Sequence, residues 1–535
     1  MMTSGSPQDP PWRPRPMSRS SALRQAKAIF RNSEVLQAVA AALTPTTGRP
    51  AVIPWDAFLV SLIWHAIIEP KNLHRTKIAD NLASLRPSDL RELGIRSSIS
   101  CAQVQRRAKQ FERRAQQGIR IADTAEPQKE RTVRLDDLTC EIVLASVPAS
   151  VARSTTIAID GTDFPTSARH KEHVDPATGE VRPSIDPDAA LAHRTATSTH
   201  DGEWYVGFEA QISTMVPALP ATRRGYAPVI PLAMGVVLKP GTHRRAEAAR
   251  HLALDLHRRG RVTECIVDRG LSFSRLETFH LPLIRAKIRR VHDLHPSQVR
   301  WRSSSVEGVL LVNGTPMPVG TPPALYRDLP VAHFTDTPAR KGQIHDQYDR
   351  LAPFACRPLG GVQPDGRQRF RGPAHPHVKK VRCVNWPQSL RWNRSLPITQ
   401  CTKGQQCKCG ATFTLRAEDD LRERQDDVWG SNRWYSSYSR RVGIESIHAA
   451  ARIHHGDLNR GYTHVLGLAG NAIAYAFGLV GVNARMLYAW HDARGLPTPW
   501  DLDAPDNGPR LRRANRNKPR RWQLGAPQVS PPPLE

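Results

Sequence analysis

A row of polar and aromatic side chains near the C-terminal end of the chain has the spacing of one helix face. In residues 431–456, SNRWYSSYSRRVGIESIHAAARIHHG, steps of three and four connect Trp434, Tyr438, Arg441, Glu445, His448 and Arg452. A solvated helix face is also rich in charge, but it rarely contains Trp and Tyr in the same row. A carboxylate with arginines on both sides suits a site that holds a metal ion with the carboxylate and phosphates with the guanidiniums.

Two aspartates have the setting of carboxylates at the end of a strand. Asp160 follows the apolar run 155–159, Asp268 follows the run 263–267, and each precedes a turn-forming sequence. Alone, either one is typical of a turn. If the two strands are neighbours, ~4.8 Å apart, both carboxylates can reach one metal ion. Glu445, on a helix laid across the sheet, could complete a site for Mg²⁺.

Together these residues resemble the catalytic set of DDE transposases, in particular the bacterial insertion-sequence group with the signature Y-x2-R-x3-E-x6-K. The signature positions are Tyr438, Arg441, Glu445, and Arg452 where the family has lysine. Asp160 in TTIAIDGTDFPTS resembles the first aspartate of the family, and Asp268 in ECIVDRGLSFS resembles the second. Arginine at 452 keeps the charge but changes the geometry of a phosphate contact. The resemblance covers residues 154–288 and 432–456.

The resemblance implies an α/β fold with an RNase H-like mixed sheet, and metal-dependent DNA cleavage and strand transfer at the ends of a mobile element. It implies that two Mg²⁺ or Mn²⁺ ions are held by Asp160, Asp268 and Glu445. The expected DNA contacts are made by Tyr438, Arg441 and Arg452, with Trp434 stacked on a base. A dimer on double-stranded DNA follows by analogy, because two ends must be held together.

Other assignments remain open. Asp163 is an alternative metal ligand, although a position in a loop is favoured for it, and Glu209 on the following strand is a weaker alternative. The chain could also be a transposase-derived DNA-binding protein without activity, or an RNase H-like nuclease that cuts without strand transfer.

Cysteines in the second half of the chain suggest a further metal site. Cys383, Cys401, Cys407 and Cys409 could make a four-thiolate zinc site, and His375 or His377 could replace one of the thiols. The C-x5-C-x-C spacing is not a standard zinc knuckle, so reduced and partly buried thiols are the alternative. Zinc would be structural here, holding together a loop-rich insertion without a visible core.

The balance of charge favours a nucleic-acid partner. The 535 residues contain 76 Lys and Arg against 49 Asp and Glu, a net charge of +27. Eight cysteines in so long a chain do not form a disulfide scaffold, and residues 1–17 lack the apolar segment of a secretory signal. These features favour a cytoplasmic protein, and the resemblance implies a bacterial one associated with the nucleoid. The apolar segment 465–482 contains glycines and Asn471, which indicates a buried helix rather than a membrane span.

The periodicity changes several times along the chain. Residues 21–114 have helical spacing and end in a basic amphipathic helix, which suits either a helix-turn-helix DNA reader or a plain helical bundle. A β-β-β-α-β-α-β order follows, with strands at 155–159, 205–216, 229–238, 263–267 and 281–288 and helices at 245–259 and 274–279. The chain is expected to begin with a disordered N-terminus (1–17) and a helical DNA-binding domain (18–124), followed by a linker (125–134). The catalytic core is expected in two parts (154–288 and 428–500). An insertion domain (289–427) with strands at 308–312 and 411–415 separates them, and a basic disordered tail (501–535) ends the sequence.

Overall fold

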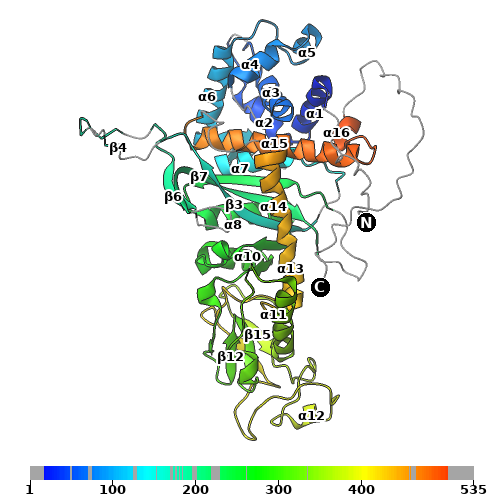
Figure 1. Cartoon of the computed structure of the whole chain (residues 1–535). Helices are drawn as coiled ribbons and strands as arrows, with labels where there is room; N and C mark the ends of the chain where they lie inside the picture. Colours follow the sequence, from blue (N-terminus) through cyan, green and yellow to red (C-terminus); the bar gives the residue numbers. More distant parts are fainter. Residues whose placement is uncertain are drawn as a thin grey trace, which may run out of the picture. The chain divides into compact units, whose positions relative to one another are not determined.

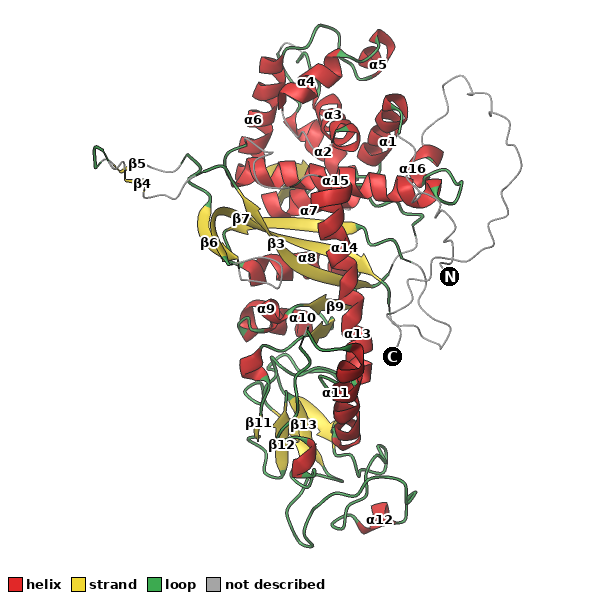
Figure 2. Cartoon of the chain, viewed as in Figure 1, coloured by secondary structure: helices red, strands yellow, loops and turns green. Residues whose placement is uncertain are grey.

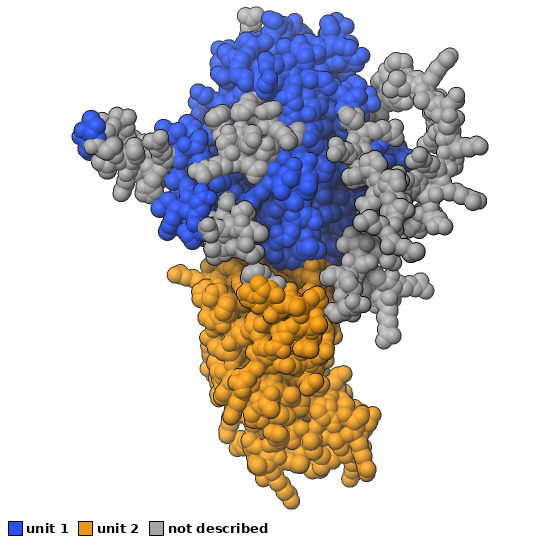
Figure 3. All heavy atoms as spheres, viewed as in Figure 1, with its two compact units in different colours: residues 1–262, 441–504 blue, residues 263–440, 505–535 orange. Residues whose placement is uncertain are grey.

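A computed structural model describes residues 17–48, 51–69, 75–123, 129–151, 154–168, 173–174, 177–179, 181–182, 185–194, 202–218, 229–260, 262–333, 335–456, 458 and 465–503. The expected disorder at 1–16 and most of the expected tail, 504–535, lie outside the described residues. The chain divides into two compact units, 1–262 with 441–504 and 263–440 with 505–535 (Figure 3). Both units contain helices and β-sheet, so the protein is of the mixed α/β class.

The first hundred residues form helices, as their apolar spacing predicts (Figure 1). Their bounds are α1 (Arg19–Arg31), α2 (Glu34–Leu43), α3 (Trp55–Ile68), α4 (Arg75–Ala83), α5 (Pro87–Glu92) and α6 (Cys101–Gln117). Ser33 caps α2, which explains why the segment 21–43 breaks into two helices at this point. A capping box of Ser100 and Gln103 starts α6, whose buried side holds Val104 and Phe111.

Helix α15 (Leu468–Asp492) is a long apolar helix of the first unit and packs against α3, α6, α7 (Leu135–Ala145) and β8 (Ala233–Pro240). Among the described residues it is the one helix long and apolar enough to cross a membrane, and 72% of its most apolar window is buried in the protein. The buried helix expected at 465–482 is therefore confirmed. Asn483 ties α15 to the sheet, because its side chain bonds both the N–H and the carbonyl of Ala233 at 2.9 Å.

The sheet of the first unit is antiparallel (Figure 2). Its strands are β3 (Thr156–Pro165), β6 (Ala190–Arg194), β7 (Glu203–Val216) and β8 (Ala233–Pro240), and β3, β6 and β8 each pair with β7. Asp160 lies opposite Ile212 in the middle of β3, so the expectation that the strand stops at Asp160 is wrong. Pairing with β7 overrides the Asp-Gly turn signal, and Gly161 leaves the space that the Glu209 carboxylate fills.

The alternation of side chains along β3 assigns its residues to two faces of the sheet. Asp160 contacts Arg441, which places α14 (Val442–Ala449) on its side of the sheet. Gly161 points the other way, since a Cβ there would lie 2.1 Å from an oxygen of Glu209. Glu209 pairs with Arg245 of α8 (Arg245–Arg258) at 3.1 Å. The helices α8 and α14 therefore cover opposite faces of this sheet.

The second unit begins with a parallel strand pair. Strand β9 (Glu264–Val267) pairs with β10 (Arg289–His292), and they are connected by α9 (Arg269–Ser272), a π-helix (Leu276–His280) and α10 (Leu281–Arg285). The strand expected at 281–288 is therefore wrong over α10. Pro282 lies in the first turn of α10, where its missing N–H costs no hydrogen bond, whereas it would interrupt a strand ladder.

The remainder of the second unit contains two antiparallel sheets and helix α11 (Pro338–Leu351). Their strands are β11 (Trp301–Ser303), β12 (Val309–Val312), β13 (Thr315–Pro318), β14 (Arg357–Pro358), β15 (Gln368–Arg371) and β16 (Thr412–Leu415). Strands β12 and β16 confirm the two expected in this region. The expectation of an insertion without a core is wrong, because Met317, Tyr348 and Trp429 belong to one buried cluster.

Residues expected to link the N-terminal helices to the sheet are ordered instead. Strand β1 (Ile119–Ala122) pairs with β2 (Glu130–Val133), and β2 leads directly into α7 (Leu135–Ala145), which packs on β8. The expected linker at 125–134 is therefore wrong over 130–134, and 124–128 lie outside the described residues. Thr139 of α7 donates a hydrogen bond to the carbonyl of Val236, so α7 covers backbone at β8.

The stretch 431–456 is not one continuous α-helix. It consists of α13 (Asn432–Tyr438), a 3₁₀ turn (Ser439–Arg441), α14 and a π-helix (Ala450–His454). These changes of pitch shift the helical phase, so a six-residue stripe counted at 3.6 residues per turn does not stay on one face. Trp434 and Tyr438 belong to the second unit, and the row from Arg441 onwards belongs to the first.

Close packing of α14 on the sheet depends on Gly443. A Cβ at this position would lie 2.8 Å from Cγ1 of Val216 on β7, inside the normal contact distance. Val216 is fully buried and β-branched, so it has little freedom to move away. The absence of a side chain at 443 thus sets the distance between the helix and the strand.

We expect Gly443→Ala to lower the free energy of unfolding by about 1–3 kcal/mol, because overpacking offsets the better helix propensity of alanine. Gly342→Ala in α11 is the matched control, since nothing lies within 4 Å of its added Cβ. The control should be neutral or stabilising by up to about 1 kcal/mol. Urea denaturation of both variants measures the difference, and equal stabilities would contradict close packing at 443.

Candidate functional site

Asp160 is a buried carboxylate surrounded by donors. Its side chain is 14% exposed, and its Oδ1 accepts a hydrogen bond from the backbone N–H of Gly161 at 2.9 Å. Burial alone would raise the pKa of Asp160, but the neighbouring His448 imidazole, the Arg441 guanidinium and the Gly161 N–H together hold this pKa below its ordinary value. The group is therefore an anion at neutral pH.

Arg441 bridges the two carboxylates that the sequence predicts for one site. Its Nη2 lies 2.5 Å from Oδ2 of Asp160, and its Nη1 lies 2.8 Å from Oε1 of Glu445. Asp160 and Glu445 thus face one cationic group, although they come from a strand and a helix far apart in sequence. Glu445 is 55% exposed on its side chain, so this end of the site is open to solvent.

The carboxylate oxygens of Asp160 and Glu445 are ligands of the kind that a divalent cation prefers. Two hard carboxylate oxygens share one positive charge, which here is a guanidinium and which Mg²⁺ or Mn²⁺ could replace. Among the described residues, the groups of three or more side chains that could hold a metal ion do not include Asp160, Glu445 or His448.

His448, a member of the predicted helix row without an assigned role, lies beside Asp160. Its Nε2 lies 3.7 Å from Oδ2 of Asp160, its side chain is 12% exposed, and neither ring nitrogen has a hydrogen-bond partner. It follows Glu445 by three residues on α14, so both side chains lie along the same side of the helix. This spacing from Glu445 was the one sequence feature that could have placed His448 in the site. Histidines are common on helix faces, however, so a site role can be assigned only when the neighbouring strand is known.

Arg452 contacts the same face of β3 two residues further along. Its guanidinium bonds the hydroxyl of Thr162, and Nη2 also lies 3.3 Å from the carbonyl of Asp163. Thr162 and Asp160 share one face of the strand, so Arg441 and Arg452 form two neighbouring positive groups above it. Thr162 was not expected from the sequence, because a threonine in a strand carries no signal of its own.

The two alternative metal ligands, Asp163 and Glu209, do not lie beside Asp160. Asp163 lies within β3 rather than in a loop, and its side chain belongs to the face opposite Asp160. Glu209 is 6% exposed, accepts a hydrogen bond from Gln211 at 2.8 Å and pairs with Arg245. Both carboxylates are thus separated from Asp160 by the strand itself.

Asp268 follows β9 directly, as the sequence predicts. Its Oδ1 accepts a hydrogen bond from the backbone N–H of Leu271 at 3.0 Å, so the carboxylate is the N-cap of the short helix α9. The turn-forming role and the strand-end position are therefore both present at this residue. Asp268 belongs to the second unit, whereas Asp160 and Glu445 belong to the first.

The aromatic part of the predicted row belongs to a core. Trp434 is 6% exposed, and its ring stacks on Tyr438 with centroids 4.9 Å apart and planes 9° apart. Its Nε1 donates a hydrogen bond to the carbonyl of His292 at 3.3 Å. Tyr438 is partly buried against the same cluster of the second unit. Trp434 therefore has no free face for the DNA base that we expected it to contact.

Four cysteines converge in the second unit. The sulfur atoms of Cys383, Cys401, Cys407 and Cys409 all lie within 4.8 Å of one another. Cys383 and Cys407 are 3.8 Å apart and Cys401 and Cys409 are 3.5 Å apart, which is too far for a disulfide. Tetrahedral coordination at a Zn–S distance of about 2.3 Å places sulfurs about 3.8 Å apart. The cluster could therefore hold a structural metal such as zinc.

The chain is packed closely around these sulfurs. A Cβ on Gly320 would lie 2.1 Å from the sulfur of Cys401, and one on Gly410 would lie 2.0 Å from the ring of Trp386. The Cys383 thiol, with the other two, lowers the pKa of Cys407. His375 and His377 stack on each other with centroids 5.4 Å apart and are not members of the four-sulfur group. The histidine substitution considered for one cysteine is not needed.

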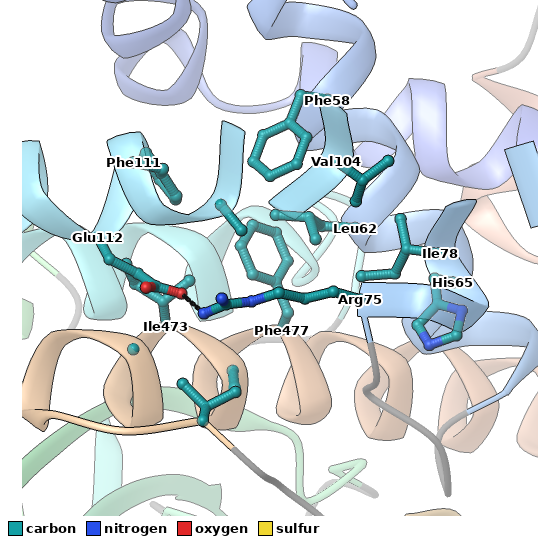
Figure 4. A pocket seen from close by; sticks show the side chains of 14 residues that line it. Phe58, Leu62, His65, Arg75, Ile78, Val104, Phe111, Glu112, Ile473 and Phe477 are labelled. Carbon is teal, nitrogen blue, oxygen red and sulfur yellow. Dashed lines mark hydrogen bonds and ion pairs between the residues drawn. The ribbon is translucent and has the colours of Figure 1, made fainter. Parts of the chain in front are cut away.

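A small cavity in the first unit is unsuited to catalysis. It has a volume of about 50 Å³ and is lined mainly by apolar side chains of α3, α4, α6 and α15 (Figure 4). The Arg75–Glu112 ion pair crosses it. Burial raises the pKa of Glu112 although Arg75 acts in the opposite direction. The cavity can hold little more than water, so the charged pair belongs to the packing of the helices.

We expect Trp434→Ala to lower the free energy of unfolding by about 3–5 kcal/mol, because it removes a large ring from the core of the second unit. Trp301→Ala is the matched control, since Trp301 is 42% exposed in the same unit. Its loss should cost far less. If thermal and urea denaturation found equal losses for the two variants, the core position of Trp434 would be contradicted.

No protein-family model, no curated protein and no solved structure matches this chain.

Proposed function

We propose that this chain is a DDE transposase with an RNase H-like catalytic core, which cuts and joins DNA at the ends of a mobile element in a metal-dependent reaction. The observation that carries the proposal is the convergence of Asp160 and Glu445 on Arg441. All three were selected from the sequence for one site, and they come from β3 and the segment around α14. The net charge of +27 supports a nucleic-acid substrate.

In this proposal Asp160, Glu445 and Asp268 hold two Mg²⁺ or Mn²⁺ ions. The ions would supply Lewis acidity to the attacking and leaving oxygens of the phosphodiester. Asp160 is suited to its role because its neighbours keep it ionised at neutral pH. Asp268 joins the site through its position directly after β9, and this step rests on the resemblance to the family.

Arg441 and Arg452 are proposed to bind DNA phosphates. Both guanidiniums lie above the Asp160 face of β3, and a guanidinium released from the carboxylates can bind phosphate with two parallel hydrogen bonds. Tyr438 is proposed as a further DNA contact because the resemblance to the family implies one at this position. Two DNA ends must be held together, so we propose a dimer on DNA in the bacterial cytoplasm.

Two related functions would give different products. A supercoiled plasmid carrying the ends of the element, incubated with the protein and Mg²⁺, separates them. Cleavage followed by joining supports a transposase, whereas cleavage without joining supports a nuclease. Binding without cleavage supports a transposase-derived DNA-binding protein.

We expect Asp160→Asn, Asp268→Asn and Glu445→Gln each to reduce cleavage by more than about 100-fold, since a lost metal ligand removes several kcal/mol of transition-state stabilisation. DNA binding, measured by mobility shift, should change little. Asp163→Asn is the matched control because its side chain lies on the opposite face of β3, and it should cut normally. Normal cutting by a variant of the first group removes that residue from the site.

We also propose that the four-cysteine cluster holds zinc in a structural role. Three of its members are buried in the core of the second unit, and four thiolates give a closed coordination shell with no position for substrate. Zinc there would stabilise the long connections between the short strands of this unit.

Purified protein should contain one zinc per chain after exhaustive dialysis, and Cys407→Ser should lose it together with several kcal/mol of stability in the second unit. Cys101→Ser is the control, since Cys101 lies on α6 away from the cluster. Metal content is measured by atomic emission. Wild-type protein that folds normally without bound metal would exclude a structural zinc site.

A further inference from the structure

A cleft of about 590 Å³ lies in the second unit, apart from the four-cysteine cluster. It is lined by residues of α10, β10 and β15, by the loop 360–362 and by the segment 421–433. Basic side chains outnumber acidic ones among the residues that line it. The acidic members are occupied, since Asp426 and Asp427 both pair with Arg289, and Asp349 accepts hydrogen bonds from Asn432.

Two arginines in the wall of this cleft have no carboxylate partner among the described residues, Arg424, which is buried, and Arg290, which is partly buried. Arg424 is 5% exposed, and its guanidinium bonds the side chain of Gln368 and the carbonyls of Arg416 and Asp419. Its Nε is buried and has no hydrogen-bond partner. Arg290 bonds only carbonyl oxygens of residues 421–424 and the His280 ring.

The acidic side chains nearest to these arginines are bound elsewhere. Asp419 accepts hydrogen bonds from Ser304 and Ser305, Asp420 pairs with Arg302, and Glu423 pairs with Arg422. No carboxylate of the described residues comes within ion-pair distance of Arg290 or Arg424. Arg424 is thus a buried cation and Arg290 a partly buried one, and removing a charge from water is costly unless a counter-charge compensates it.

Burial, and then repulsion by Arg424, lowers the pKa of Arg290 to about 10. Burial lowers the pKa of Arg424 to about 10, although the carboxylates of Asp419, Asp420 and Glu423 act in the opposite direction. Burial, and then the charge of Arg290, lowers the pKa of His292 well below its ordinary value. Both arginines remain cations at neutral pH.

We propose that this cleft is a phosphate-binding site, in which Arg424 and Arg290, together with the other basic side chains that line it, provide the charge. The volume admits a phosphate group with the nucleoside attached to it. The shared chemistry is the phosphate, whether it belongs to the DNA backbone or to a free mononucleotide. The site is separate from Asp160 and does not depend on the transposase proposal.

The loop beside the cleft offers a test that leaves the arginines in place. Gly361 lines the cleft and is exposed, and an added Cβ would meet nothing within 4 Å. Gly361→Glu introduces a negative charge at the cleft, and Gly361→Gln introduces a side chain of the same size without the charge. Neither substitution removes a contact of the core.

The test is the binding of inorganic phosphate, of a nucleoside monophosphate and of a short DNA oligonucleotide to the full-length protein at constant ionic strength. Calorimetry and thermal shift measure affinity and stabilisation. We expect saturable binding by the wild type, a loss of at least ten-fold in Gly361→Glu and near-normal affinity in Gly361→Gln. Arg424→Met, which keeps a side chain of similar length without the charge, should lose binding as Gly361→Glu does.

The outcomes separate the sources of the ligand. Binding of phosphate or the mononucleotide that depends on residue 361 identifies a free phosphorylated ligand. Binding of the oligonucleotide alone, with the same dependence, identifies the DNA backbone. Equal affinities of Gly361→Glu and Gly361→Gln for every probe, or no saturable binding by the wild type, would overturn the proposal even if the protein cuts DNA.

Discussion

The ion pairs that Arg441 makes with Asp160 and Glu445 are the constraint on which the candidate site depends. They join a helix face to the middle of a strand, and they fix which residues of both can act together. Close contact between α14 and β7 is needed for this, and Gly443 permits it by leaving Val216 in place. The same face then gathers His448, Thr162 and Arg452, while the strand separates Asp163 and Glu209 from them.

The proposed function would give Arg441 a second role, which it cannot fill while it pairs with the two carboxylates. In the described arrangement it neutralises two carboxylates, which removes the repulsion of two anions held close together in a partly buried place. A divalent cation bound by the same carboxylates would release the guanidinium. The proposed phosphate contact of Arg441 and the proposed metal site are thus linked, because binding of the metal makes the arginine available to DNA.

The second unit has a different basis for its stability. Its strands are short, and its buried cluster combines Trp429, Trp434 and Tyr348 with three of the converging cysteines. Charge is also placed inside this unit. Arg440 and Arg289 share the carboxylate of Glu264, whereas Arg290 and Arg424, which line the cleft, have no carboxylate partner among the described residues. The two ligands proposed for this unit are a metal ion and a phosphate group.

The sequence by itself determined most helices of the N-terminal region, the strands β3, β7, β8, β9, β12 and β16, the grouping of Asp160 with Glu445 and the four cysteines. These features depend on local periodicity, or on clusters of carboxylates and cysteines that are uncommon unless they serve a site. Tertiary structure decided the features that depend on contacts between residues far apart in the sequence. It extended β3 through Asp160 because β7 supplies a partner along its whole length, and it turned 281–285 into a helix because Pro282 fits a first turn. It also placed Trp434 in a core and His448 beside Asp160, because the neighbours of a side chain across a fold are set by packing and not by its own sequence.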